Sequence, residues 1–491
     1  MRTATLSFDR HRLISSLLIV ALAGATSVGL LWASSSFETK WLFASVLGLL
    51  FFLVALCSAR FERFMLGVIF ITIPINLDVN FDFSNTIDRF NLPTGTPRFG
   101  ISVIDIALCA LFVIWLFRWI ANSKNQSLIW PSGLGLLLSF LAWAGLTMFW
   151  ARDLGLSLGL WLSFLKAVFY FFFVANYVRT SKELWFIAKC MIVGLVLESL
   201  ICGAQHAVGG NLGLSFLGEP RDPKEIVLSA GTMFRVSGTM GHSNALGGYL
   251  AMLIPLTLAA ALAPASALSR IFTGASFVLG STVLFLSYCR SAWLVTFLAC
   301  AILVLRSLIQ RPRSLPLIFG IFLSLVIVLG AFLPQIKGRL LEDDKGSAVS
   351  RLSQWKMAGT VIKSHPLLGV GLNNYAAVAH LYETNVESED IRGRVYLYQG
   401  RIHNVFLVLA AEVGLTGLFL MLLFFGVAAF RGWQNFAAAR SALAASLLTG
   451  MALGLFGRLF HDFVHTGNFA SNMFIWIYSA CLVSSSIRDS S

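Results

Sequence analysis

Apolar runs recur along this 491-residue chain, and many reach the roughly 20 residues that a helix needs to cross a bilayer. Each helical residue advances the chain by about 1.5 Å, so shorter runs fail to cover a hydrocarbon core of about 30 Å. Hydrophobic residues make up 57% of the chain and charged residues only 12%, which excludes an ordinary soluble domain. The sequence therefore predicts an all-α polytopic membrane protein.

By apolar length and periodicity the candidate spans number about fourteen. In chain order they are residues 13–33, 41–58, 64–78, 101–120, 133–150, 160–178, 184–207, 244–263, 271–289, 291–309, 315–334, 403–430, 441–459 and 471–486. The first resembles a signal peptide, but its apolar part is too long, so we expect a retained span. Because 64–78 is short and Arg290 alone separates 271–289 from 291–309, we expect about 12–14 transmembrane helices.

Lys and Arg outnumber Asp and Glu by 36 to 23, and they fall on alternate loops. Positive charge marks the cytoplasmic side, so this excess is a topology signal and not a nucleic-acid site. The cytoplasmic set is Arg60, Arg63, Arg118, Lys124, Arg179, Lys182, Arg270, Arg306, Arg311, Arg313, Arg431, Arg440 and Arg488. Both chain ends are then cytoplasmic. The longer stretches 79–100, 208–243, 335–402 and 460–470 face the other side.

The largest of these stretches, 335–402, has helical periodicity and is not a disordered linker. Apolar residues recur from Ser350 until Pro366, and a second helix is expected from Tyr375 to about residue 381, capped by Asn373 or Asn374. Amphipathic helices in a loop lie on the membrane surface or over the mouth of a bundle. We therefore expect one integrated domain: a first part of the bundle (1–334), a lid loop (335–402) and a last part of the bundle (403–491).

The stretch Arg235 to Asn244, RVSGTMGHSN, places a cation and two glycines before an apolar helix. Free backbone N–H groups and the positive end of a helix dipole attract anions, and a guanidinium adds a full charge. Arg235, Gly241, Ser243 and Asn244 are therefore candidates for binding a phosphate. The alternative is a glycine-rich turn in which Ser243 or Asn244 caps the span and Arg235 contacts lipid headgroups.

Arg290 stands between two apolar runs, on the side of the membrane where the charge rule disfavours cations. A guanidinium stays charged and binds phosphate oxygens in a fork, so this residue needs a partner. The alternative to phosphate binding is a structural salt bridge. Arg290 and Arg235 are expected at the same membrane face.

His403 opens an apolar helix after a polar, basic loop. With about 100° of turn per residue, Ala410, Gly414 and Gly417 fall within roughly 40° of His403, so this stripe would let another helix approach closely. A neutral imidazole accepts a proton from a hydroxyl, although a histidine at a helix end can also be a cap or an interfacial residue. Glu412 projects from the opposite face and is expected to pair with a basic residue of another helix. The candidates for that partner are Arg458 and Lys166.

His461, Asp462 and His465 form a further polar cluster on the same side. The i, i+4 histidine spacing could bind a metal, but there is no strong third ligand nearby in the sequence, so we rank a metal below an acceptor-binding or structural role. The seven cysteines lie mostly in apolar segments without CxxC spacing and are interpreted as packing residues. We expect no metal and no cofactor.

Several of these motifs together resemble the O-antigen ligase and O-antigen polymerase superfamily, which are bacterial membrane glycosyltransferases acting on undecaprenyl-diphosphate-linked glycans. The ligase-like signature is His403-Asn404, nine residues, then Gly414-Leu415-Thr416-Gly417. Arg290-Ser291-Ala292-Trp293-Leu294 fits the Arg-x-x-x-Leu of the family, and Arg235 precedes the glycine-rich span start. Arg351 with Trp355, and the stretch from His365 to Tyr375, look like the loop pattern of polymerases of O-antigen and exopolysaccharide.

The resemblance implies a GT-C-like fold and a metal-independent, inverting glycosyl transfer at the periplasmic face of the inner membrane. Arg235 and Arg290 would hold the donor diphosphate, and His403 would take the proton from the acceptor hydroxyl. Residues of the loops and of the acceptor side would contact the glycan. The candidates for that role are Arg351, Trp355, Asn373, Tyr375, Arg401, His461 and Asp462.

The resemblance leaves two acceptors open. A polymerase extends another lipid-linked glycan, whereas a ligase transfers the glycan to lipid A-core. The signature at His403 favours a ligase and the loop from Gly369 to Tyr375 favours a polymerase, and we lean to polymerase. The implied partners are the lipid-linked donor, a glycan or lipid A-core acceptor, the bilayer and a chain-length regulator. A lipid-oligosaccharide transporter, which would place charged residues along a path through the membrane, is ranked behind both enzymes. This alternative stays open because four charged residues lie within apolar runs: Lys166, Lys189, Glu198 and Arg458.

Overall fold

The computed structural model describes residues 59–75, 78–81, 83, 99–121, 128–222, 225–228, 231–310, 315–333, 337–338, 347–382, 402–465 and 467–484. The chain divides into two compact units. Unit 1 is Met1–Phe70 with Val103–Leu128, and unit 2 is Ile71–Ser102 with Ile129–Ser491. Unit 1 contains most of α3 (Ala59–Thr72) and α5 (Val103–Ala121), both strongly apolar helices. All the candidate site residues lie in unit 2.

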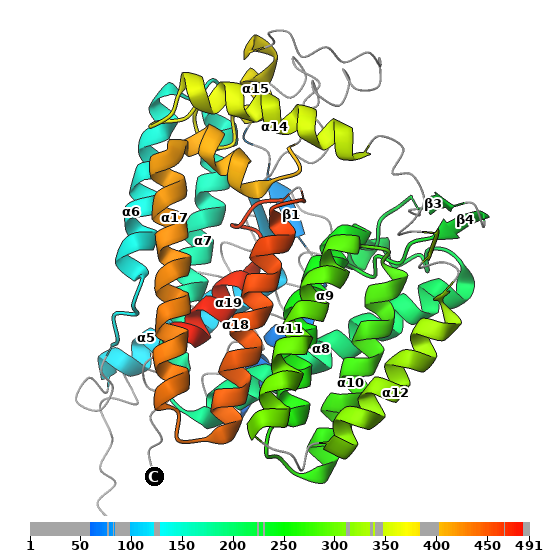
Figure 1. Ribbon diagram of the computed structural model, residues 1–491. Coiled ribbons are helices and arrows are strands. Elements are labelled where there is room, and N and C mark those ends of the chain that lie inside the picture. The colour runs from blue at the N-terminus through cyan, green and yellow to red at the C-terminus, as the bar shows by residue number, and fades with distance from the viewer. Residues whose placement is uncertain are drawn as a thin grey trace, which may run out of the picture. The chain divides into compact units, whose positions relative to one another are not determined.

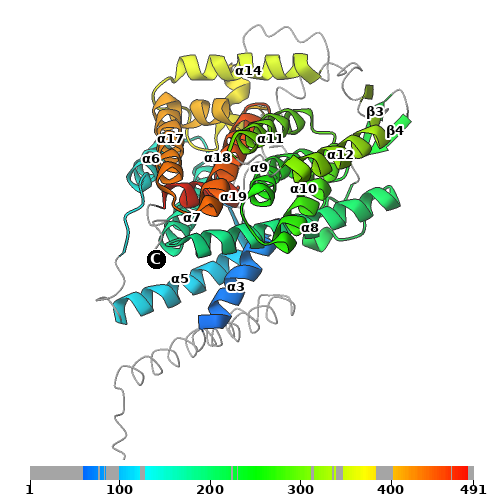
Figure 2. The same ribbon diagram turned by 60° about the horizontal axis from the view of Figure 1, so that its bottom comes forward.

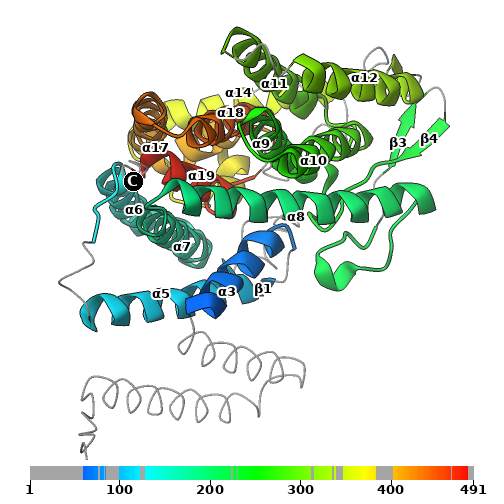
Figure 3. The ribbon, with the colours of Figure 1, turned by 90° about the horizontal axis from the view of Figure 1, so that it is seen from below.

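Unit 2 is organised around α9 (Ser243–Leu262). Its neighbours are α8 (Ser181–Val208), α10 (Ala267–Leu286), α11 (Arg290–Gln310) and α18 (Ala442–Asp462), which all contact it (Figure 1). In α9, 94% of the most apolar 18-residue window is buried, against 33% in α11. Figures 2 and 3 show α8 running across α9 and α10. The central helix is therefore surrounded by protein, while α11 is covered over much less of its length.

A second group of helices packs beside α18. It consists of α6 (Leu134–Leu146), the 3-10 turn η1 (Thr147–Trp150), α7 (Leu154–Tyr177), α17 (Val405–Ala438) and α19 (Met473–Val483). The short helix α19 is buried between α7, α17 and α18, and its Trp476 is fully buried. Further along the chain from α11, α12 (Leu315–Ala331) packs on α10.

The predicted lid helices are present. Figure 1 shows α14 (Ser347–Ser364) lying across one end of the upright helices α17 and α18, with the short α15 (Tyr375–Val378) and η4 (Ala379–Tyr382) next to it. Met357, Ala358 and Val361 of α14 are buried in a small apolar cluster with Tyr375 and with residues of α17. The apolar face of the lid is thus buried against the bundle mouth, as its periodicity indicated.

Two short antiparallel ribbons accompany the helices, and the sequence patterns predicted neither. In the first, β1 (Asp78–Phe81) pairs with β2 (Phe99–Ser102), with Asp78 opposite Ser102. In the second, β3 (Glu225–Leu228) pairs with β4 (Gly231–Phe234), with Glu225 opposite Phe234. The second ribbon ends one residue before Arg235 and leads the chain into the predicted phosphate site. The 3-10 turn η2 (Ser215–Leu217) precedes it.

The predicted fold class is confirmed. The described residues contain seven helices long and apolar enough to span a membrane, and five shorter apolar helices. Helices α10 and α11 are separate, so the division at Arg290 is right. The span predicted at 64–78 begins and ends earlier, as α3, because a turn follows Thr72. The predicted spans 13–33 and 41–58 lie outside the described residues.

The helix after His403 differs from its prediction. It begins at Val405, with Asn404 as the N-cap accepting a hydrogen bond from Leu407 N–H, and it is broken at Gly414, whose backbone is non-helical (φ 72°, ψ 174°). The stripe from His403 through Gly417 is therefore not continuous. The segment before α15 fills the break: Val370 and Gly371 donate to the carbonyls of Ala411 and Glu412. Glycine is required because its φ is in the left-handed region and because a Cβ there would meet the backbone of Leu367.

Candidate active site

One end of unit 2 gathers the N-termini of α9, α11 and α17 and the C-terminus of α18. Arg235 lies just before α9, Arg290 begins α11, His403 precedes α17 and His461 is in the last turn of α18. The predicted membrane-face grouping of these residues therefore corresponds to a real cluster of helix ends. The contacts within it join segments that are far apart in the sequence.

Arg235 lies next to the turn that carries Arg290. Its Nε and Nη2 donate to the carbonyl of Ser287 at 3.0 and 2.8 Å, and Nη2 also donates to Asn244 Oδ1 at 2.9 Å. Ser287 is three residues before Arg290, so the two guanidinium groups belong to one local structure. Both arginines are half-buried. Two cations at the dipole-positive ends of α9 and α11 make this region suited to an anion.

The turn between α10 and α11 is fixed by its own hydrogen bonds. Ser287 Oγ donates to the carbonyl of Leu284 and accepts from Cys289 N–H, and Trp293 Nε1 donates to Leu284 as well. Tyr288 has a φ of 52°, a left-handed conformation that is costly for an aromatic residue. Strain of this kind persists where the surrounding structure determines it, and it is common at functional sites.

The glycine-rich loop before α9 is held by hydrogen bonds to side chains of α8. Glu198 accepts hydrogen bonds from both Thr239 N–H (2.7 Å) and Thr239 Oγ1 (2.8 Å), while Gln205 Oε1 accepts from the backbone N–H groups of Ser237 and Gly238. Glu198 and Gln205 are seven residues apart and lie on one face of α8. Both side chains are buried. The loop that carries Arg235 is thus positioned through its backbone.

The cap of α9 differs from the prediction. The N-cap is His242, whose Nδ1 accepts from Asn244 N–H at 3.0 Å, and neither Ser243 nor Asn244 caps the helix. Asn244 instead accepts from Arg235, and Ser243 Oγ donates to the Arg235 carbonyl at 3.3 Å. Gly241 has a φ of 72° in the turn before the cap. These residues therefore shape the Arg235 loop.

Glycines in the first turns of α9 let two other helix ends approach. A Cβ at Gly247 would lie 2.8 Å from Cys289 Cβ, and one at Gly248 would lie 2.9 Å from Arg458 Cζ and 3.1 Å from His461 Cε1. Real Cβ atoms do not tolerate the shorter of these distances, so larger residues would push α11 and α18 away from α9. Close packing of small residues is typical of membrane helices.

Cys289 joins the predicted histidine pair, His461 and His465, in a buried cluster. Cys289 Sγ lies 3.5 Å from His461 Nε2 and 3.6 Å from His465 Nε2, and His465 Nε2 is 3.0 Å from Ser291 Oγ. Burial alone would raise the pKa of the Cys289 thiol, but its contacts with His461 and Ser291 bring the pKa to about 7. The i, i+4 spacing indicated the histidine pair, but not Cys289, because 172 residues separate it from His461.

His403 is oriented by a side chain of the lid helix. Gln354, which is buried on α14, accepts from His403 N–H at 3.1 Å, and the same Oε1 lies 3.0 Å from His403 Nδ1. A backbone N–H can only donate, which identifies the Gln354 atom as oxygen, so Nδ1 must carry a proton. In the neutral imidazole, Nε2 then carries the lone pair that can accept a proton.

The lid helix contributes two further predicted residues. Trp355 Nε1 donates to the His403 carbonyl at 3.3 Å, and its ring packs edge-on against Phe463 at a centroid distance of 5.6 Å. Arg351 lies one helical turn earlier. Burial lowers the pKa of His465, and the charges of His461, Arg351 and His403 lower it further. Arg351 and His403 therefore lie near the buried histidine cluster.

The other acceptor candidates have different surroundings. Asn373 and Tyr375 are each only 3% exposed, and Asn373 Nδ2 donates to the Leu156 carbonyl of α7. His461 and Asp462 are also buried, and Asp462 forms a salt bridge of 2.9 Å with Arg458. Arg401 lies outside the described residues.

The expected partners of Glu412 are wrong. Arg458 pairs with Asp462, and Lys166 Nζ donates to the Gly100 carbonyl. The Glu412 carboxylate instead accepts from Tyr375 N–H at 3.4 Å and holds the segment that fills the break in α17. A segment without regular secondary structure can pack into the break of an apolar helix only when its backbone N–H and C=O groups find hydrogen-bond partners there.

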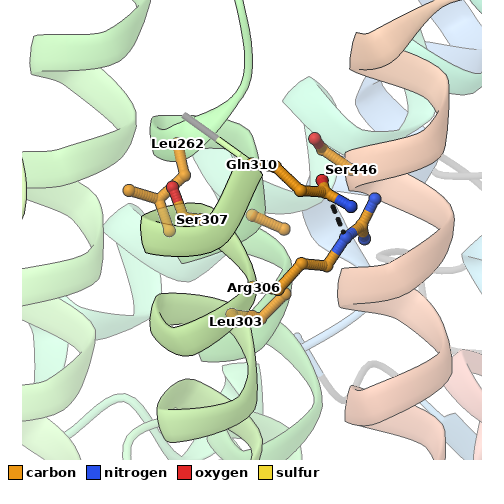
Figure 4. Close-up of a pocket in the computed structure, with 7 residues that line it drawn as sticks. Leu262, Leu303, Arg306, Ser307, Gln310 and Ser446 are labelled. Atoms are coloured by element: carbon orange, nitrogen blue, oxygen red, sulfur yellow. Dashed lines mark hydrogen bonds between the residues drawn. The ribbon is translucent and has the colours of Figure 1, made fainter. Parts of the chain in front are cut away.

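A small cavity of about 30 Å³ lies at the opposite ends of α11 and α18 (Figure 4). Leu303, Arg306, Gln310 and Ser446 are among its lining residues, and Arg306 Nε donates to Gln310 Oε1. A volume of this size holds about one or two water molecules, which excludes a lipid-linked glycan. The cluster of helix ends around Arg235 and His403 is therefore the better candidate site.

Residues 275–422 match the family model described as O-antigen ligase. This stretch includes Arg290, the lid helix with Gln354, and His403 with the break at Gly414. A search of curated proteins gives no match. The matched family consists of enzymes of the O-antigen ligase and glycosyltransferase type. The match bears out the resemblance found in the sequence, because residues 275–422 are similar to the O-antigen ligase domain.

Proposed function

We propose that the protein polymerises undecaprenyl-diphosphate-linked oligosaccharide repeat units, of O-antigen or exopolysaccharide, at the periplasmic face of the bacterial inner membrane. One observation carries the catalytic part of this proposal: the hydrogen bond to Gln354 leaves His403 Nε2 as the proton-accepting nitrogen, in the cluster of helix ends that contains Arg235 and Arg290. The family match supports the general type of activity.

In this proposal Arg235 and Arg290 bind the donor diphosphate. The backbone around Gly241 and the first turn of α9, Ser243 and Asn244, add the positive end of a helix dipole. As the bond between the anomeric carbon and the phosphate oxygen breaks, the electron pair leaves with undecaprenyl diphosphate. The two guanidinium groups stabilise the negative charge that develops there.

His403 acts as the general base. The acceptor hydroxyl attacks the anomeric carbon from the face opposite the diphosphate, and its proton goes to His403 Nε2, so the anomeric configuration inverts. The positive charge of the guanidinium pair makes this step independent of a metal ion. Arg351, Trp355 and Arg401 are proposed to contact the glycan from the lid. The buried residues Asn373, Tyr375, His461 and Asp462 are proposed to support these contacts from behind.

An in vitro transfer assay tests these roles. Purified protein with a lipid-diphosphate-linked glycan should lose roughly 10²- to 10⁴-fold in rate on His403→Ala, the range of a well-placed general base. Arg290→Ala should be comparably impaired. Arg431→Ala, an exposed arginine near the far end of α17, serves as the matched control and should keep its activity. Full transfer by His403→Ala and Arg290→Ala would refute the assignment.

Ligation to lipid A-core is the second candidate function, because the spacing from His403 to Gly417 fits the ligase signature. Glycan chain-length analysis in a deletion strain separates the two. Loss of long chains while single repeat units still reach the surface supports polymerisation. Full-length chains stranded on the lipid carrier would instead establish ligation.

Sidedness is tested with reporter fusions. Alkaline phosphatase fused after Lys345, in the loop before α14, should be active, and the same enzyme fused after Arg311 should be inactive. The reverse pattern would place the site on the cytoplasmic side and overturn the proposed location. Both chain ends are proposed to be cytoplasmic.

A further inference from the structure

The cluster of Cys289, His461 and His465 has the composition of a metal site. Its ligand atoms, one sulfur and two imidazole nitrogens, all lie within 4.8 Å of one another. The side chains come from the turn before α11, from the end of α18 and from the segment after it. All three residues are buried, with exposures of 2%, 1% and 7%.

The separations between these atoms fit a tetrahedral ion. Zinc binds sulfur at about 2.3 Å and imidazole nitrogen at about 2.0–2.1 Å, so two such ligands at a tetrahedral angle lie about 3.6 Å apart. The two distances from Cys289 Sγ to the histidine Nε2 atoms are 3.5 and 3.6 Å. The rings of His461 and His465 are stacked at a centroid distance of 4.1 Å, so binding an ion would require them to turn their Nε2 atoms toward it.

The surroundings of His461 agree with this geometry. Its Nδ1 is buried and lacks a hydrogen-bond partner in the described part of the chain, and Asp462 Oδ1 lies 3.8 Å away. A metal-binding histidine commonly directs its other nitrogen to a carboxylate, which fixes the ring and its tautomer. Arg458 balances the charge of that carboxylate. Nε2, the nitrogen that faces Cys289, would then be the ligand.

The fourth position has a candidate as well. Ser291 Oγ lies 3.0 Å from His465 Nε2 and 3.6 Å from Cys289 Sγ. A hydroxyl is a weak zinc ligand, so Ser291 itself or a water held by it would complete the shell. Thiolate and imidazole together favour zinc over magnesium or calcium, which prefer oxygen ligands.

We propose that Cys289, His461 and His465 bind one Zn²⁺ ion, with Cys289 as the thiolate, and that this ion fastens the turn carrying Arg290 to the end of α18. Binding releases the thiol proton to solvent. The role is structural, because the ligands are buried and the transfer chemistry proposed above needs only His403 and the two arginines. The inference goes beyond the proposed function, and metal content can be measured without any transfer assay.

Metal analysis of the full-length protein tests the site. The protein, purified in detergent without a histidine tag and dialysed against Zn²⁺ and then metal-free buffer, should retain about one zinc per chain. Cys289→Ser and His465→Gln should each retain far less. Cys300→Ser, the same change within α11 and 11 residues further along the chain, is the matched control and should retain the wild-type amount. Zinc in Cys289→Ser equal to wild type would refute the site.

A second measurement uses the wild-type chain, so it does not depend on how the variants fold. Replacement of zinc by Co²⁺ should produce a thiolate-to-cobalt charge-transfer band in the near ultraviolet, because the site contains a cysteine. A chelator should remove the band and lower the melting temperature of the wild type, with a smaller effect on Cys289→Ser. Absence of the band after exposure to Co²⁺ would mean that the cluster is only hydrogen-bonded, and the proposal would fall.

Discussion

The loops that carry Arg235 and His403 lie at the same end of unit 2 but are held in different ways. The Arg235 loop is fixed through its backbone: Glu198 and Gln205 of α8 accept from the N–H groups of Ser237, Gly238 and Thr239. His403 is fixed through side chains of α14, 49 and 48 residues earlier in the chain. We call these parts the donor loop (residues 235–243) and the base support (Gln354 and Trp355).

This difference has a functional meaning. The donor loop is held by hydrogen bonds from its backbone N–H groups to Glu198 and Gln205, so its position does not depend on what its exposed side chains contact. His403, the proposed base, depends in contrast on how α14 packs on the bundle, because its tautomer is set by the amide of Gln354. Changes in the lid should therefore affect proton transfer, and changes in α8 should affect donor binding. The following predictions test this separation.

The largest effect is expected at Gly414, where the segment before α15 enters α17. Gly414→Ala introduces a Cβ against the Leu367 backbone at a positive φ, and we expect a loss of about 3 kcal/mol or more in stability. Gly426→Ala, in the same helix with no atom near the added Cβ, should change stability by about 1 kcal/mol or less. Thermal unfolding in detergent measures both. Equal melting temperatures for the two variants would mean that the break does not anchor the lid.

Gln354→Leu removes the acceptor for both His403 N–H groups. We expect kcat to fall roughly 10- to 100-fold, less than the roughly 10²- to 10⁴-fold loss expected on removing the base itself, while the KM for the donor stays the same. Gln354→Glu restores the acceptor, so it should recover much of the rate. Because a carboxylate favours the protonated imidazole, the acid limb of its pH–rate profile should move to higher pH. A change in donor KM with unaltered kcat would contradict the separation.

Glu198→Leu leaves the N–H and hydroxyl of Thr239 buried without this acceptor, at a cost of about 1–3 kcal/mol. We expect the KM for the donor to rise about tenfold with a smaller change in kcat, since a factor of ten corresponds to about 1.4 kcal/mol. Glu198→Gln keeps an acceptor for Thr239 N–H and should be much milder. Lys189→Leu, an exposed change on the same helix, is the control. A selective fall in kcat in Glu198→Leu would place α8 in the base support instead.

The smallest effect is expected for Trp355→Phe. It removes the hydrogen bond to the His403 carbonyl but keeps an aromatic ring against Phe463. A neutral hydrogen bond contributes about 1 kcal/mol, so kcat should fall by about threefold to fivefold. Steady-state kinetics of Trp355→Phe and Gln354→Leu, measured side by side, will compare the two losses in kcat. A larger loss than that of Gln354→Leu would show that the backbone of His403 matters more than its tautomer.

The sequence was most informative about the helices. Apolar length located the described spans, including the separation of α10 from α11 at Arg290, because membrane crossing depends on length and composition. It also singled out Arg235, Arg290 and His403 as candidates, which the structure brings to one end of unit 2, since a cation or an imidazole at the end of an apolar run is costly without a role. The break at Gly414 was missed, because its cause is a segment about 45 residues earlier that supplies the hydrogen bonds.

The supporting residues were harder to predict. Gln354 stands on the same face of α14 as Ala358 and Val361, and a polar residue on a buried face is a signal that was overlooked. Glu198 was noticed only as a sign of a transport path, yet both of its oxygens bind Thr239. The partners of Cys289 could not be deduced, because helix packing and not spacing brings them together.

The seating of the segment before α15 in the break of α17 has a consequence for biogenesis. Residues 366–371 leave the ribosome before the Gly414 region, so their backbone groups stay exposed until α17 has been synthesised. When α17 arrives, Leu415 N–H binds the Pro366 carbonyl, and Val370 and Gly371 bind the carbonyls just before the break. Helix α17 and residues 366–371 therefore supply each other's backbone hydrogen-bond partners. Until that moment the Pro366 carbonyl and the N–H groups of Val370 and Gly371 lack these partners.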